Sequence, residues 1–225
     1  MTEKTMKLAI AFVLALGLSG AAAAEAPTFD MPSGTFNAPL PDGYCLPSGT
    51  LDIAMKMLAE ADKTNKTDIS FVFCDDLKSG IPTSWGGIKT PLAMLNGHAG
   101  ARLEALAQVK ALFGTEAGKK LLNVTEDDIK TKTGLRELFG KDFTGTTKIE
   151  PLGSDDNAVY FGGVVNYDDG KGRLEKVACA YAITVARDNA FLLILYKEFE
   201  STDDIATLLA KVKPAVASFI AANGG

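Results

Sequence analysis

The sequence predicts an α+β domain in which helices flank an antiparallel sheet. Three observations lead to this prediction. The first half of the chain carries helical periodicity, the second half carries strand-like runs joined by turn-rich connectors, and the chain closes on an amphipathic helix. This order favours a C-terminal meander covered by helices on both faces, that is, an α-β-α sandwich.

Residues 1–24 have the three parts of a secretory signal peptide. Lys4 and Lys7 give a positive start, residues 8–18 are an apolar run, and small residues precede a predicted cleavage after Ala24. The apolar run is shorter than the ~20 residues that span a bilayer, and Ala21 stands where a lipoprotein would carry its cysteine. We therefore expect a periplasmic protein with no stable membrane insertion after signal removal.

The chain that follows the predicted cleavage has 201 of the 225 residues, which suits one domain. Residues 25–34 are rich in Pro and Gly and are predicted to be a flexible N-terminal segment, with an extended edge segment at 35–40. The single domain is expected over residues 35–225. The formal net charge is -5, and no basic stretch alternates with aromatic residues, so nucleic acid is not expected as a partner.

The first half of the chain is predicted to alternate helices with a strand. Leu51, Met55 and Leu58 recur at helical spacing behind Thr50, which is predicted to be the N-cap of a helix. The other predicted elements of this half are a strand at 68–76, an extended or loop segment at 81–91, a helix at 101–114 that buries Leu103, Leu106, Val109 and Phe113, and a helix at 125–140.

The second half is predicted to form four strands, at residues 146–152, 157–167, 173–186 and 190–199. The third run has one face of Val, Cys, Tyr and Ile side chains and an opposite face made almost entirely of alanine, which lets a helix lie close to it. The fourth run is apolar on both faces, which predicts a central strand. The closing helix contains Pro214, which is expected to kink or split it.

Two stretches resemble the PsbP/DcrB-like proteins: "FNAPLPDGYC" at residues 36–45, and the run from Ala180 to Ile220 that ends in "LLAKVKPAVASFI". Proteins of that family open with an aromatic- and Pro-rich strand and close with antiparallel strands and a long helix. The resemblance implies an α-β-α sandwich on the outer or lumenal side of a membrane, with a binding or assembly role. The chain departs from DcrB-type members in lacking a lipoprotein cysteine.

The three cysteines allow a structural and a reactive interpretation. In an oxidising compartment Cys45, before the first helix, is expected to bridge to Cys74, at the end of the next strand. Cys179 lies in mid-strand and is expected to be a buried thiol. Alternatively, Cys45 of "CLPS" would be an acidic redox nucleophile at a helix start. No close-spaced cysteine pair or neighbouring histidine indicates a metal site.

Trp85 and His98 are the two candidate binding residues. Trp85 is the single tryptophan, beside two glycines, and forms either an exposed stacking surface or a cover over one edge of the core. His98 is the only histidine, so a Ser-His-Asp site would have to use it, but its turn-rich surroundings favour a surface role.

No cofactor motif is complete. Residues 114–120 depart from the P-loop and residues 166–175 depart from the calcium-loop pattern. The sequence therefore favours a non-enzymatic binding or assembly module for a protein or envelope component. The alternatives are a thiol redox enzyme that uses Cys45 and a carrier of a small apolar ligand.

Overall fold

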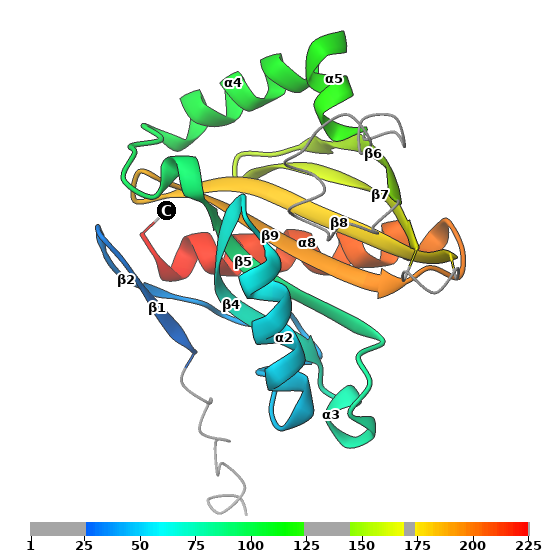
Figure 1. Cartoon of the computed structure of the whole chain (residues 1–225). Helices are drawn as coiled ribbons and strands as arrows, with labels where there is room; N and C mark the ends of the chain where they lie inside the picture. The colour runs from blue at the N-terminus through cyan, green and yellow to red at the C-terminus, as the bar shows by residue number, and fades with distance from the viewer. Residues whose placement is uncertain (1–25, 124–144, 169–173, 225) are drawn as a thin grey trace, which may run out of the picture.

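The computed structural model describes residues 26–123, 145–168 and 174–224. Their main sheet contains seven strands: β3 (Tyr44–Cys45), β4 (Asn65–Phe73), β5 (Ser84–Pro91), β6 (Gly145–Ser154), β7 (Ala158–Asp168), β8 (Leu174–Ala186) and β9 (Asn189–Glu198). The strand order is β3-β4-β5-β9-β8-β7-β6, and every neighbouring pair is antiparallel. The α+β prediction and the C-terminal meander are thus confirmed (Figure 1).

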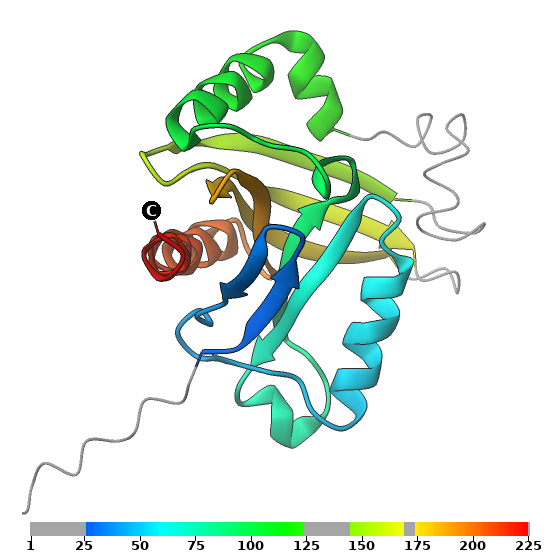
Figure 2. The ribbon, with the colours of Figure 1, turned by 90° about the vertical axis from the view of Figure 1, so that its left-hand side faces the viewer.

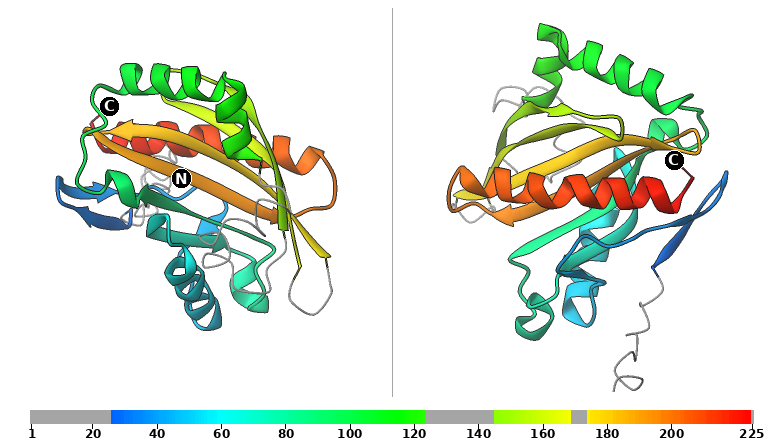
Figure 3. Two further views of the ribbon diagram at one scale, coloured as in Figure 1. Left: turned by 45° about the horizontal axis from the view of Figure 1, so that its top comes forward. Right: turned by 180° about the vertical axis from the view of Figure 1, so that it is seen from behind.

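Helices lie on both faces of this sheet. On one face, α8 (Asp203–Ala222) crosses β7, β8 and β9, as the view from behind shows (Figure 3). On the other face, α2 (Thr50–Ala61) contacts β4, α4 (Arg102–Phe113) contacts β7 and β8, and α5 (Glu116–Leu122) contacts β6. Two short helices, α3 (Asp76–Ser79) and the 3-10 helix η1 (Leu92–Met94), lie at the ends of β4 and β5.

The alanine face of β8 brings α8 close to the sheet, as predicted. Ala178, Ala180 and Ala182 are fully buried in the same cluster as Val212 and Val216 of α8. Gly162 on β7 extends this close approach, since a Cβ there would lie 2.8 Å from the side chain of Ile205. Small residues on two neighbouring strands therefore form the seat of the helix.

The central position predicted for the strand at 190–199 is also confirmed. β9 is the fourth of the seven strands, between β5 and β8. Leu193 and Leu195 enter the cluster beneath α8, whereas Leu192 and Ile194 pack with the residues beneath α4.

The segment at residues 81–91, expected to be extended or loop, contains a strand inside the sheet. β5 pairs with β4 on one side and β9 on the other. Its two glycines allow this, because a Cβ on Gly86 would lie 2.2 Å from the carbonyl oxygen of Ile194, and one on Gly87 would lie 2.7 Å from that of Ile69. The glycines that lowered the strand propensity are required for the close approach of the neighbouring strands.

The N-terminal region differs from the expected flexible segment at 25–34. β1 (Thr28–Met31) and β2 (Gly34–Asn37) form a separate two-stranded hairpin (Figure 2) instead of an edge segment of the main sheet. Phe29, Met31 and Phe36 are buried in the cluster beneath α8. Pairing and burial of these side chains order a segment whose composition alone suggested flexibility.

Three further expectations on the helices were wrong. Pro214 does not split the closing helix in two, because residues on both sides of this exposed proline are held against the sheet and α8 continues through it. Thr50 is the first helical residue, and Gly49 takes the N-cap position without a side-chain bond. Leu103, expected to be buried, is exposed, as is Leu58 on the apolar spacing of α2. The predicted helix at 125–140 and the signal peptide lie outside the described residues.

By length and hydropathy alone, α8 could cross a membrane. Its large apolar side chains face the sheet, however, and its exposed positions hold alanine, polar and charged residues and Pro214. Within the described part of the chain it is therefore a core helix.

Candidate binding groove

Two neighbouring strands place different chemistry on the two faces of the sheet. Trp85 on β5 is paired with Tyr196 on β9, and the preceding Ser84 is paired with Lys197. Because successive side chains of a strand point to opposite faces, the aromatic pair faces α2 and the polar pair faces α8. Each face therefore presents its own candidate site.

Trp85 is half-buried and forms the floor of a groove. Its ring stacks on the ring of Tyr196 with 5.6 Å between centroids and 22° between planes. It also packs with Leu51 and Met55 of α2 and with Val72 of β4. Trp85 thus covers a small core, as one of its two interpretations expected, and the part of its ring that lines the groove is open to contact.

The groove has a volume of about 780 Å³ and runs between α2 and the ends of β8 and β9. One wall is apolar and is formed by α2 and the connection between α3 and β5. The opposite wall is formed by the start of β8, the end of β9 and the residue after β9. The lining residues on the apolar wall are Met55, Leu58, Ile81 and Pro82, and those on the opposite wall are Glu175, Lys176, Val177, Glu198 and Phe199. Such a groove suits an apolar side chain or segment bordered by polar groups.

Exposed apolar side chains are frequent in the segment that forms one wall of this groove, and two of them, Leu58 and Ile81, line it. The described residues contain eight large exposed ones, and five lie between residues 46 and 81: Leu46, Ile53, Met57, Leu58 and Ile81. Met57 and Ile81 are 67% and 68% exposed. Because exposed apolar side chains beside a groove are costly to leave in water, Leu58 and Ile81 indicate an interaction surface.

The groove residues outside Trp85 were not predicted. Leu58 was noted only for its helical spacing, and Ile81 and Phe199 were not singled out. One signal was present in the sequence, because α2 has more apolar positions than a single buried stripe requires.

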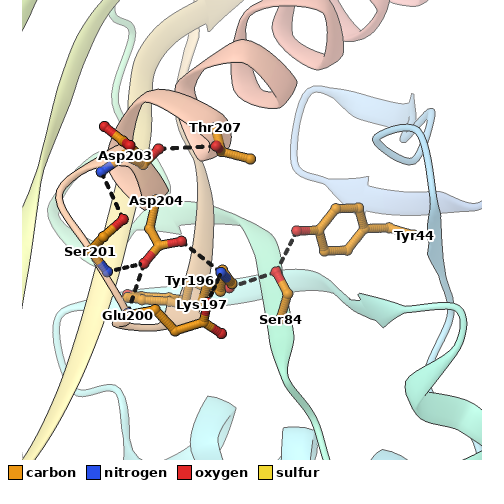
Figure 4. Close-up of polar contacts among 9 residues, drawn as sticks. All are labelled: Tyr44, Ser84, Tyr196, Lys197, Glu200, Ser201, Asp203, Asp204 and Thr207. Atoms are coloured by element: carbon orange, nitrogen blue, oxygen red, sulfur yellow. Dashed lines mark hydrogen bonds and ion pairs between the residues drawn. The ribbon is translucent and has the colours of Figure 1, made fainter.

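The α8 side of the same strands carries a polar cluster (Figure 4). The Ser84 hydroxyl donates to the carbonyl of Tyr196 over 2.8 Å and lies 2.5 Å from the Tyr44 hydroxyl. Burial raises the pKa of Tyr44, so this phenol stays protonated and can donate to Ser84. These bonds tie β3, β5 and β9 together.

Lys197 and Asp204 fasten the start of α8 to β9. Their side chains are 2.6 Å apart, and Asp204 also accepts from the backbone N–H groups of Glu200 and Ser201. The hydrogen bond from Lys197, with those backbone donors, lowers the pKa of Asp204 to about 2. The same pair raises the pKa of Lys197. Lys197 is therefore a protonated partner of Asp204 and not a base for the neighbouring Ser84, so this cluster supports structure rather than hydrolysis.

The predicted bridge between Cys45 and Cys74 is present, with 5.0 Å between their Cα atoms. It joins the end of β3 to the residue that follows β4, so one cysteine precedes α2 and the other precedes α3 along the chain. Cys179 is free and 1% exposed, and burial raises its pKa to about 12. Within the described residues no group of three or more His, Cys, Asp and Glu side chains could hold a metal ion.

His98 is exposed in the connection between η1 and α4. This connection follows the end of β5 opposite to Trp85, so the structure does not bring the two candidate binding residues together. Trp85 belongs to the groove, and His98 does not line it.

Comparisons with protein-family profiles, with curated proteins and with solved structures found no match for this chain. The geometry of the site therefore carries the functional argument.

Proposed function

We propose that the chain is an exported, non-enzymatic binding or assembly module that holds a protein or envelope component in its Trp85 groove. The observation that carries this proposal is the groove itself, with its aromatic floor and its exposed rim of Leu58 and Ile81. Aromatic floors with apolar rims are typical of surfaces that bind other proteins. The implied PsbP/DcrB-like role and the predicted periplasmic location agree with this function, and the disulfide suits an oxidising compartment.

A photo-reactive amino acid at Ile81 tests this function in cells that export the chain. We expect a defined adduct, because Ile81 lies on the rim of the groove and is 68% exposed. The matched control carries the same amino acid at Leu112, which is 48% exposed on α4 and lies outside the groove. The adduct should disappear when Leu58→Asp is added. Equal adducts at both positions, or none at Ile81, would contradict the proposed function.

The alternatives make different predictions. A thiol redox enzyme needs Cys45 to leave its disulfide and react as a thiolate, so after reduction it should be alkylated at low pH. A carrier of a small apolar ligand should retain that ligand in native mass spectrometry of protein taken from its own compartment. If reduced Cys45 is not alkylated at low pH and native mass spectrometry shows the protein without a bound ligand, the binding module remains the favoured function.

A further inference from the structure

A second, smaller pocket lies at the opposite end of β8 from the groove, and we call it the arginine pocket. Its volume is about 270 Å³, and it forms where the start of α4, the turn between β8 and β9 and the chain just beyond α8 meet (Figure 3). Its lining residues are Gly100, Arg102, Val185, Arg187, Asp188 and Gly224. Val185 is the one large apolar side chain in this lining, so the charged side chains decide what the pocket can hold.

Both arginines in the described part of the chain line this pocket. The sequence has four arginines among its 23 basic residues, and Arg102 and Arg187 come from distant parts of it. Arginine differs from lysine in its planar fork of donors, which matches the oxygen atoms of a carboxylate or a phosphate group. The meeting of two arginines in a lysine-rich chain therefore points to an oxyanion.

Neutral oxygen atoms hold both guanidinium groups in place without cancelling their charge. Arg102 donates from Nε to the carbonyl of Asp156 over 3.1 Å. Arg187 donates from Nη2 to the carbonyl of Thr35 and to Oδ1 of Asn223. Among the described residues neither arginine has an ion pair, and the remaining guanidinium N–H groups have no hydrogen-bond partner. These donors are oriented in advance and are still free to bind a ligand.

The turn that carries Arg187 favours a role for its side chain. Arg187 and Asp188 lie between the paired residues Ala186 and Asn189, and their φ angles are 45° and 61°. Two-residue hairpin turns of this kind prefer Asn-Gly, because most side chains are strained at positive φ. Arg187 takes the position instead, with its guanidinium 3.9 Å from the centroid of the Phe36 ring. Strain of this kind is typical of functional positions.

The pocket keeps a net positive charge. Asp188 is the one acidic side chain in its lining, and it forms no ion pair with either arginine. Glu104, in the first turn of α4, does not line the pocket. Because the whole chain has a formal net charge of -5, this local excess of positive charge sets the pocket apart and attracts anions to it.

We propose that the arginine pocket binds a small oxyanion, a carboxylate or a phosphate group. Arg102 and Arg187 donate to its oxygen atoms from the N–H groups that the protein leaves free. The site is separate from the Trp85 groove and does not rest on the proposed function, since the groove involves the start of β8 and the pocket its end.

Titration of the exported chain with phosphate and with succinate at constant ionic strength tests this site. We expect saturable changes in the backbone amide NMR signals of Gly100 and Asp188 with at least one of the two anions. A response to phosphate alone assigns the site to phosphate groups, and a response to succinate alone assigns it to carboxylates. Changes no larger than those produced by chloride overturn the inference.

Variants of Arg102 test the guanidinium directly. Arg102→Gln should raise the dissociation constant at least about tenfold, because it removes one of the two charged forks. Arg102→Lys keeps the charge but loses the fork, so it should recover only part of the affinity. The control is Lys110→Gln, which removes an exposed charge from the same helix outside the pocket and should bind as the wild type does. Unchanged affinity in Arg102→Gln, or an equal loss in Lys110→Gln, overturns the inference.

Asp188→Asn gives a second measurement that leaves both arginines in place. Asparagine tolerates positive φ well, so this variant should keep the thermal midpoint of the wild type. Removal of the one acidic side chain in the lining should tighten the binding of the same anion. Weaker or unchanged binding by Asp188→Asn would overturn the placement of the anion in this pocket.

Discussion

At the residue scale, Asp62 fixes the connection between α2 and β4. Its carboxylate accepts from the backbone N–H groups of Thr64 and Asn65 and lies 2.7 Å from the ammonium group of Lys89. Burial would raise the pKa of Asp62, but the hydrogen bond and charge of Lys89, together with the neighbouring donors, outweigh it and lower the pKa to about 2. The side chain is 11% exposed, so solvent screens this interaction little.

Asp62 should therefore contribute stability that depends on acid pH. Its folded pKa lies below the unfolded value near 4, so the contribution is complete above about pH 5 and is lost as the pH falls toward 2. We expect Asp62→Asn to lower the free energy of unfolding by roughly 2 kcal/mol at pH 7 and by far less at pH 2.5. Urea unfolding at both pH values measures this.

Asp75→Asn is the matched control, because the side chain of Asp75 is 78% exposed and its contact with Lys78 is 3.7 Å long. It should change the stability by less than about 0.5 kcal/mol at either pH. An equal loss for Asp62→Asn at both pH values would mean that its charge is not the stabilising feature.

At the element scale, β5 shows why local patterns miss a central strand. The two prolines and two glycines in residues 81–91 lower strand propensity, which led to the expectation of an extended or loop segment. In the structure, carbonyl oxygens of the neighbouring strands lie so close to the two glycines that a Cβ atom would clash with them. Pro91 is the last residue of the strand. Pairing with β4 and β9 determines the conformation of residues 81–91. Because both partners lie outside this segment, its own sequence does not indicate the pairing.

Gly86→Ala should separate β5 from β9. The added Cβ would lie 2.2 Å from the carbonyl oxygen of Ile194, and backbone cannot move away as a flexible side chain can. We expect a loss of at least about 2 kcal/mol in the free energy of unfolding. Gly97→Ala is the control, since its nearest contact would be an ordinary 3.7 Å. Similar thermal midpoints for the two variants would show that β5 does not approach β9 this closely.

At the scale of the whole molecule, features formed by neighbouring segments could be predicted and those formed by distant segments could not. The meander follows from strand-turn-strand runs, and the bridge of Cys45 to Cys74 follows from one helix and one strand between them. The pairing of Trp85 with Tyr196 joins the two halves of the chain and has no local signal. The groove depends on that pairing, which is why only its floor residue was singled out.

The disulfide connects the stability of the chain to the shape of the groove. Cys45 precedes α2 and Cys74 precedes α3, so the bridge anchors the wall that carries Leu58 and Ile81. Its two cysteines are 29 residues apart, for which the chain-entropy model gives about 3.5 kcal/mol of stabilisation. The Cys45→Ser/Cys74→Ser variant should lose stability of this order in urea unfolding, and the reduced wild type should match it.

Removal of the disulfide should also destabilise α2 more than the rest of the native structure. Without the bridge, α2 is held mainly by one small cluster, in which Leu51 and Met55 pack with Val72, Leu77 and Trp85, whereas β8 keeps strands on both sides. We therefore expect amide hydrogen exchange to accelerate in α2 more than in β8, because α2 becomes the less stable unit. Uniform acceleration across α2 and β8 would show instead that the disulfide stabilises the molecule as a whole and leaves the groove wall unchanged.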